Sequence, residues 1–251
     1  MNKKSSSSKL LKIMEFLVNH PQGIGLTKIA KSLSLSSPSV HRFMSILMEE
    51  GWVDQNQHKK YFLTFKITSL GEKYLRKQEI REIAHPFLLK LRDQVGETIH
   101  LGVLQGNLIV YLDKIDSKQT IQLASHVGSS VPCHCTALGK IILAFSDEEK
   151  VKSILSTVEW IKYTENTIDN IDDFVKEIRM TKERGYSIDN VEWERGIRCF
   201  AAPIMNYEKK VIAAVSVSGP AFLQSEEVNK NIISNMLNIS KEISMSFGST
   251  N

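Results

Sequence analysis

The chain has 251 residues, of which 42% are hydrophobic and 24% charged, a balance typical of a globular protein with room for two modest domains. Its longest apolar stretches, such as 211–217, are too short to cross a bilayer, and no small-residue cleavage site follows the lysines near the N-terminus. Three cysteines cannot all pair within one chain, which is typical of a reducing compartment. We therefore expect a cytoplasmic protein with no membrane partner.

The net charge of +4 is unevenly distributed along the chain. Residues 1–80 hold 13 Lys and Arg against 6 Asp and Glu, a net charge of +7, whereas the remainder holds 19 against 22, a net charge of −3. A basic front on a slightly acidic body indicates that only the front meets a polyanion, although a solvated basic tail would give the same count.

The first third of the chain predicts three helices in close succession. Apolar residues recur at helical spacing over 10–17 and again over 26–33, and the break between them contains a proline and two glycines. A third helix is predicted to follow Ser37 as its N-cap, with Pro38 at the first helical position, where its missing N–H costs nothing. Gly51 closes this helix.

The outer face of the third predicted helix carries small, hydrogen-bonding or basic residues near its start. Such a face suits a recognition helix, whose N-terminal half enters the major groove, and we expect Arg42 to contact guanine through O6 and N7. A three-helix module with a polar, protein-binding outer face is the alternative. The predicted DNA-binding residues, which include two lysines of the following hairpin, are Ser37, Pro38, Ser39, His41, Arg42, Ser45, Lys59 and Lys60.

A β-hairpin is predicted directly after the third helix. Two short strands over 52–54 and 61–64 flank a polar tip, and the basic residues at this tip would reach phosphate or the minor groove. The sequence therefore predicts a winged helix-turn-helix DNA-binding domain over 1–65, followed by a linker helix over 66–80.

The remainder, 81–251, predicts a single effector-binding domain. After a helix over 80–91 that Pro86 either kinks or restarts, hairpins and helices follow one another without regular βαβ alternation, which favours an α+β fold with an antiparallel sheet flanked by helices. The expected strands cover 98–103, 108–112, 120–124, 186–191, 197–204 and 211–217, and the expected helices cover 136–145, 147–155, 172–184 and 225–247.

Several stretches, taken in order and spacing, resemble the IclR family of bacterial transcriptional regulators over nearly the whole chain. The helix-turn-helix of that family is similar to LTKIAKSLSLSSPSVHRFMSILMEEGWV, and its wing and linker entry are similar to KYFLTFKITSLG. Its C-terminal domain is similar to GSSVPCHCTALGKIILA, ERGYSIDNVEWERGIRCFAAPI and AAVSVSGP. The resemblance implies a GAF-like effector domain that binds small organic acids or aromatic metabolites, in a homodimer or homotetramer that represses or activates transcription.

The resemblance also places the effector contacts on Ala137, Leu138, Asp189, Cys199, Ser216 and Ser218. The chemistry of these residues is consistent with an organic acid as the ligand. Thr136 could cap a helix that starts at Ala137, so that free N–H groups hold a carboxylate. Ser216 and Ser218 lie two apart on a strand and face the same side, and Asp189 can accept a hydrogen bond from a ligand hydroxyl.

Cys133, His134, Cys135 and Cys199 leave three further interpretations open: a metal site, a Cys–His nucleophile and a redox sensor. The Cys-x-Cys spacing is narrower than that of most zinc sites and no second Cys/His pair follows nearby, so packing of these residues around the pocket is the favoured interpretation.

A ligand-controlled regulator is the first hypothesis for function. We expect a repressor of a catabolic operon that binds double-stranded operator DNA and a small-molecule effector, a small organic acid, and that needs no metal or other cofactor. The sequence shows no phosphate-binding glycine motif and no complete catalytic constellation. The alternative is an enzyme that acts on a small metabolite in the C-terminal domain, with the winged helix as an interaction module.

Overall fold

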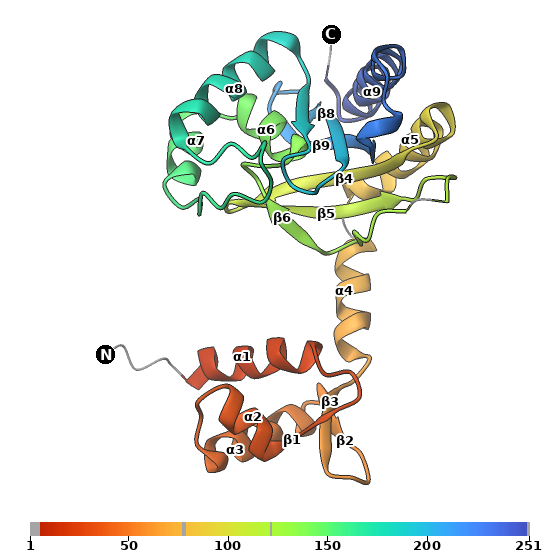
Figure 1. Ribbon diagram of the computed structural model, residues 1–251. Helices are drawn as coiled ribbons and strands as arrows, with labels where there is room; N and C mark the ends of the chain where they lie inside the picture. Colours follow the sequence, from red (N-terminus) through yellow and green to blue (C-terminus); the bar gives the residue numbers. More distant parts are fainter. Residues whose placement is uncertain (1–5, 77–78, 121, 250–251) are drawn as a thin grey trace. The chain divides into compact units, whose positions relative to one another are not determined.

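The computed structural model describes residues 6–76, 79–120 and 122–249, and the chain folds into two compact units, Met1–Lys77 and Gln78–Asn251 (Figure 1). Of the linker helix predicted over 66–80, residues 66–77 belong to the first unit and 78–80 to the second. Within the residues that the structure describes, no helix combines the length and the apolar character needed to cross a membrane.

The first unit is a three-helix cluster with a small antiparallel sheet in the order β1-β3-β2. Its elements are α1 (Ser6–Val18), β1 (Ile24–Gly25), α2 (Leu26–Ser32), α3 (Ser37–Glu49), β2 (Val53–Gln55), β3 (Lys60–Leu63) and α4 (Lys66–Arg76). The helix-turn-helix and the wing are thus where the sequence predicts them. The two-residue strand β1 was not expected, and α3 begins one residue early, so that Ser36 rather than Ser37 is its N-cap and Pro38 is its second residue.

The core of this unit is formed by the predicted apolar faces. Ile13 and Leu17 of α1 pack with Ile29 of α2 and with the inner face of α3, and Tyr61 of β3 closes the cluster. This packing fixes which side of α3 is left to solvent.

The second unit contains a six-stranded antiparallel sheet in the order β6-β5-β4-β9-β8-β7 and helices on both of its faces, which confirms the predicted α+β fold (Figure 1). Its strands are β4 (Thr98–Gln105), β5 (Leu108–Ile115), β6 (Ser130–Pro132), β7 (Ser187–Asn190), β8 (Ile197–Met205) and β9 (Val211–Pro220). Its helices are α5 (Glu79–Val95), α6 (Ala137–Ala144), α7 (Glu148–Leu155), α8 (Ile171–Arg184), a short 3-10 turn at Ala221–Leu223, and α9 (Glu226–Ser246).

The prediction of a strand over 120–124 is wrong. Residue 121 lies outside the described residues, and its described neighbours do not form a strand; β6 pairs with β5 instead. The polar groups of this segment are satisfied by side chains of the sheet, because Lys114 donates to the carbonyl of Leu123 and Ser125 hydrogen-bonds His100. The helix around Pro86 runs as one element, α5.

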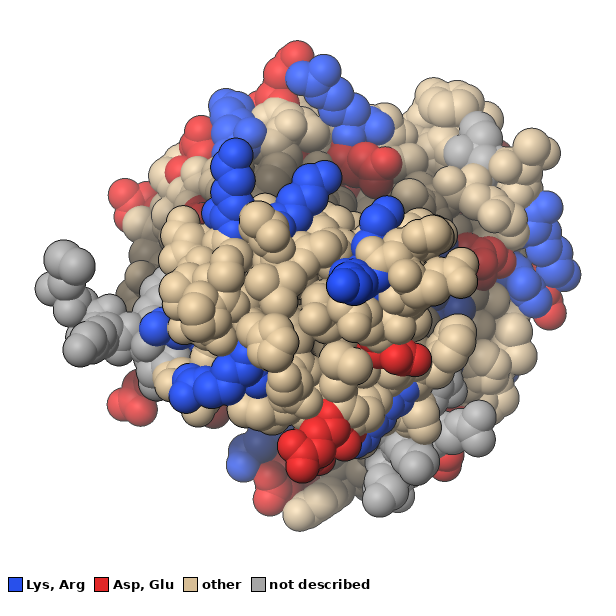
Figure 2. Space-filling model, turned by 90° about the horizontal axis from the view of Figure 1, so that it is seen from below, with Lys and Arg blue, Asp and Glu red and all other residues tan. Residues whose placement is uncertain are grey.

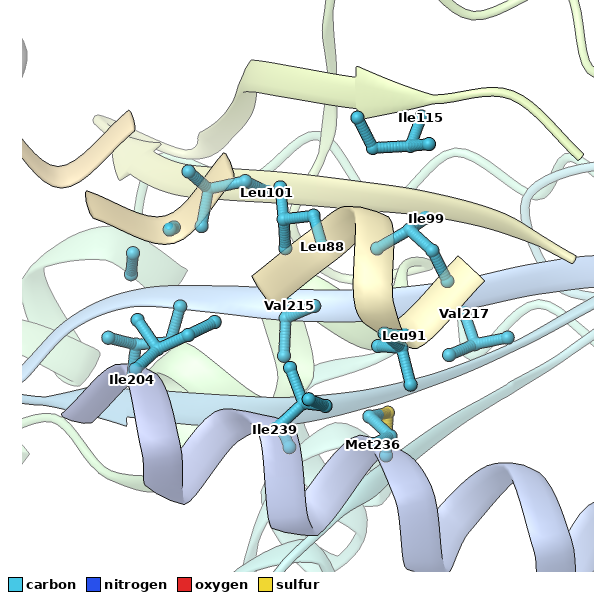
Figure 3. Close-up of a cluster of buried hydrophobic side chains, with 14 of the residues drawn as sticks. Leu88, Leu91, Ile99, Leu101, Ile115, Ile204, Val215, Val217, Met236 and Ile239 are labelled. Atoms are coloured by element: carbon cyan, nitrogen blue, oxygen red, sulfur yellow. The ribbon is translucent and has the colours of Figure 1, made fainter. Parts of the chain in front are cut away.

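Each face of the large sheet has its own apolar core. Leu88 and Leu91 of α5 and Met236 and Ile239 of α9 cover one face, where they meet alternate residues of β4 and β9 such as Ile99 (Figure 3). The other face is covered by α6 and α8, and it also carries the polar residues described next.

Candidate functional site

The exposed face of α3 presents the residues predicted to contact DNA. Pro38, His41, Arg42 and Ser45 are exposed, while the opposite side of the helix is buried in the core. The guanidinium of Arg42 lies 5.2 Å from the ring centroid of Phe43, and no ion pair to another described residue holds it. Ser36 and Ser39 share a hydrogen bond at the helix start, so the predicted surface begins at the cap.

The wing tip is ordered by a single asparagine. Asn56 Oδ1 accepts hydrogen bonds from the main-chain N–H groups of His58 and Lys60, and Lys59 adopts a left-handed φ of +55° between them. Both lysine side chains are exposed. Figure 2 shows Lys and Arg side chains at several places on the face that it presents, with uncharged surface and Asp and Glu side chains among them rather than one continuous basic patch.

The second unit brings four of the six predicted effector residues onto one face of the sheet. Asp189 of β7 is paired with Cys199 of β8, and Cys199 is paired with Ser218 of β9, so these three residues form one row across the strands. Ser216 lies two residues before Ser218 and therefore on the same face. This face is the one that α6 covers, because Ala201, the partner of Ser216, packs in the core beneath α6.

The remaining two predicted residues form the start of α6. Thr136 caps the helix by accepting from the N–H of Gly139, as expected, and the Ser187 hydroxyl donates to the Ala137 carbonyl at 2.7 Å. That hydrogen bond fastens the helix start to β7, next to Asp189. The side chain of Leu138 packs in the apolar cluster, so its contribution to a polar ligand would be its main-chain N–H.

The electrostatics of this site are dominated by burial. Asp189 is 2% exposed, and desolvation raises the pKa of its carboxyl to about 7, although the main-chain N–H groups of Glu192 and Trp193 oppose the shift. Burial and then the neighbouring Asp189 raise the pKa of the Cys199 thiol. Within the described part of the chain no lysine or arginine forms an ion pair with Asp189, so the site offers hydrogen-bond donors rather than a cation.

His100 and Tyr111 extend the same face of the sheet, and Ser125 contacts His100 from the segment between β5 and β6; the sequence reasoning missed all three. His100 of β4 is buried, its Nε2 lies 2.7 Å from Ser125 Oγ, and its ring stacks on Tyr111 at 4.6 Å. Burial lowers the pKa of His100 to about 3, so the imidazole is neutral at physiological pH. Ser218 Oγ lies 3.5 Å from His100 Nδ1, which links these residues to the predicted site. The available signal was a lone histidine within an apolar strand.

The Cys133-His134-Cys135 segment packs as the favoured interpretation describes. Both thiols are buried, and desolvation raises the pKa of Cys133 to about 12 and that of Cys135 further, the opposite of the shift that activates a nucleophile. His134 Nε2 hydrogen-bonds the Ile161 carbonyl at 3.1 Å. Among the described residues, no three His, Cys, Asp or Glu side chains are placed to hold a metal ion.

Comparisons with known proteins agree with this architecture. The family model of the IclR helix-turn-helix domain matches residues 6–57, and that of the bacterial transcriptional regulator IclR C-terminal domain matches residues 72–245. The HTH-type transcriptional regulator KdgR of Dickeya chrysanthemi is 34% identical over 246 residues, which are 97% of this chain and 81% of that protein. The transcriptional repressor IclR of Escherichia coli (strain K12) is 25% identical over 97% of this chain and 90% of its own length.

A solved structure extends the likeness to three dimensions. The crystal structure of the Thermotoga maritima IclR has a TM-score of 0.80 and 34% sequence identity, and the match covers 97% of this chain and 98% of that one. The two family models match in the expected order, and the winged helix and the antiparallel sheet agree with them. The chain therefore belongs to the IclR family of bacterial transcriptional regulators.

Proposed function

We propose that this regulator is a cytoplasmic repressor that binds operator DNA through the first unit and a small organic acid in the second. The observation that carries the proposal is the cluster of short polar groups buried beneath the start of α6, on a face of the sheet that otherwise packs in an apolar cluster. Groups of this kind are placed to orient a small ligand. The E. coli relative IclR is named a transcriptional repressor, which supports repression rather than activation.

The effector we infer is a compact acid that carries a hydroxyl or keto group. The main-chain N–H groups of Ala137 and Leu138, at the start of α6, would hold its carboxylate together with the hydroxyls of Ser216 and Ser218. Asp189 would accept a hydrogen bond from the ligand hydroxyl, and Cys199 would supply a small, soft wall. No metal or other cofactor takes part in this scheme.

The proposal is tested by screening compact keto and hydroxy acids, with pyruvate, lactate and glycerate as the first probes. Binding is measured by calorimetry, and release of the protein from the DNA upstream of its own gene is measured by mobility shift. A regulator releases DNA and returns the acid chemically unchanged, whereas the enzyme alternative would convert it. If no acid binds or changes DNA affinity, the proposed effector class is wrong.

Arg42→Ala is expected to weaken operator binding by about 1–3 kcal/mol and to relax specificity at one base pair, because it removes a bidentate base contact. Lys60→Ala is expected to weaken binding to all sequences alike and to reduce the salt slope by about one unit, because it removes one phosphate contact. Competition binding over operator variants distinguishes the two, and Lys150→Ala, an exposed change in the second unit, is the control. Equal losses on every operator variant for Arg42→Ala would remove its assigned role.

We also propose that two copies of the chain associate through the first unit and read a pseudopalindromic site. Leu11 and Val18 are 58% and 57% exposed on α1, and Leu70 of α4 is similarly exposed. We expected Tyr74 beside Leu70, but the side chain of Tyr74 lies outside the described part of the structure. Light scattering should show a dimer or tetramer at micromolar concentration. Leu11→Asp with Val18→Asp should lower that mass, and Ser7→Asp, an exposed change on the same helix, should not. A stable monomer that still binds a full operator would contradict the proposal.

A further inference from the structure

A buried lysine lies one turn into α6, the helix whose start faces the proposed effector site. Lys140 is 1% exposed, and its ammonium donates to Glu192 Oε1 at 2.5 Å and to the Ile188 carbonyl at 3.0 Å. Glu177 Oε1 lies farther away, at 4.0 Å, and is itself paired with Arg184. The side chain of Glu192 is itself buried. Because removing two charges from water costs about as much as their attraction returns, stability alone does not account for such a pair.

Glu192 connects this ion pair to the effector site. Its carboxylate accepts from Lys140, while its main-chain N–H donates to Asp189 Oδ1 at 2.7 Å. The same carboxylate oxygen also accepts from the N–H of Asn190 at 3.1 Å, so the side chain folds back over the turn that follows β7. Glu192 therefore links the Lys140 ammonium, through its side chain, to the carboxyl of Asp189, through its main-chain N–H.

The turn that carries Glu192 has a conformation that its sequence does not favour. Val191 has φ of +61°, in the left-handed region that a β-branched residue rarely adopts. The segment that precedes α8 holds the turn by three of its side chains. Their hydrogen bonds run from Asn166 Nδ2 to the Asn190 carbonyl at 2.9 Å, from Thr164 Oγ1 to the Val191 carbonyl at 2.6 Å, and from Thr167 Oγ1 to the Glu192 carbonyl at 2.6 Å. These three hydrogen bonds stabilise the unfavourable conformation of the turn.

We propose that Lys140 is a positioning residue of the effector site, which fixes Glu192 so that the Glu192 amide orients the carboxyl of Asp189. The inference rests on the proposed function, because that function assigns Asp189 to the effector. Glu192 Oε2 has no hydrogen-bond partner among the described residues, so the Lys140 ammonium is the group that compensates the buried carboxylate. Replacing Lys140 alone would leave that carboxylate buried without its cation, and the variant could fail to fold.

The test therefore replaces both charges by apolar residues of similar volume, as Lys140→Met with Glu192→Met. Such exchanges commonly keep or raise stability, so the melting temperature should equal or exceed that of the parent. Hydrogen exchange of the residue-192 amide, measured by NMR on the full-length protein without effector, should be at least about tenfold faster, because this amide is no longer held against Asp189. Amides of the β7–β8 ladder should keep their parental exchange rates, apart from that of Asn190, which loses the Glu192 carboxylate as its acceptor.

The control is Lys90→Met with Glu242→Met, which removes an exposed ion pair of the same unit and should leave the residue-192 amide unchanged. If the Lys140/Glu192 variant does not fold, Lys140→Gln with Glu192→Met decides. This pair leaves neither charge, keeps a donor for the Ile188 carbonyl and still removes the Glu192 carboxylate, so the same acceleration is expected. Exchange at residue 192 within twofold of the parent in the folded variant would overturn the proposal, and so would an equal acceleration along the whole β7–β8 ladder, which marks a purely structural role.

A second readout uses the acid found in the screen described above. The variant should need about tenfold more of it to release the operator, while operator affinity without acid stays at the parental value. If no acid acts on the parent, the proposed function fails, and the exchange experiment still decides the role of Lys140.

Discussion

Asp189→Ala and Ser218→Ala are each expected to weaken effector binding about five- to 150-fold, while operator affinity without effector stays nearly unchanged. The expected range follows from about 1–3 kcal/mol for each hydrogen bond lost to a charged or buried ligand group. Both side chains lie in one row across β7, β8 and β9, in the second unit, whereas the predicted DNA-binding residues lie in the first. Calorimetric titration with the acid, followed by mobility shift on the operator, measures the two effects separately.

The matched control for these variants is Ser246→Ala, whose hydroxyl donates only to the Glu242 carbonyl on the exposed side of α9. It should bind the acid as the parent does. If Asp189→Ala and Ser218→Ala also bind the acid with parental affinity, the pocket lies elsewhere, and the Cys133–Cys135 segment becomes the next place to examine.

The raised pKa of Asp189 should give effector binding at the proposed site a pH dependence of defined sign. A ligand carboxylate placed beside Asp189 favours the protonated form of its carboxyl, so binding takes up a proton when Asp189 is ionised beforehand. Because the pKa of Asp189 is about 7, affinity should rise as the pH falls from 8 to 6. Asp189→Asn, which resembles the protonated form, should flatten this profile. Calorimetry in buffers of different ionisation enthalpy measures the proton uptake.

Gly139→Ala is expected to destabilise the second unit by about 3 kcal/mol or more, above the usual cost of overpacking a core. A Cβ at this position would overlap the Cys133 carbonyl oxygen and lie 2.5 Å from Cys133 Cα. These are backbone atoms of the segment that leads into α6, and they cannot rotate away. Urea unfolding followed by the fluorescence of Trp160 and Trp193, both in the second unit, measures the loss.

Gly102→Ala is the matched comparison. Its Cβ would lie 2.9 Å from Ile109 Cγ2 and from Leu138 Cδ1, which are side-chain atoms rather than backbone atoms. The expected loss is about 1 kcal/mol, within the ordinary range for overpacking. Equal losses for the two variants would contradict the assignment of Gly139 as the point of close backbone approach.

The sequence by itself determined the order of the three helices α1, α2 and α3 and the face that each of them buries. Periodicity of 3.6 residues is a local property, so the inner face of α3, and with it the exposed position of Arg42, followed from spacing alone. The hairpin tip at Lys59 and Lys60 and the cap at Thr136 likewise depend on residues close together in the chain.

Strand pairing was beyond such reasoning, because it joins residues far apart in the chain. The segment around 120–124 has a strand-like composition, yet β5 pairs with β6, and side chains of β4 and β5 satisfy this segment instead. His100 shows the same effect. It reads as one polar residue in an apolar strand, and only the register of β4 against β9 places it beside Ser216 and Ser218.

The charged path behind the proposed effector site was decided by tertiary structure alone. Lys140 lies in an apolar stretch of α6, 52 residues before Glu192, and helical spacing predicts nothing about a partner so distant in the chain. Their contact, and the left-handed Val191 next to it, arise because α6, β7 and the segment before α8 meet in one buried place. A buried charge needs a compensating partner, and the fold can supply that partner from any part of the chain. The spacing of residues in the sequence therefore does not predict which partner it is.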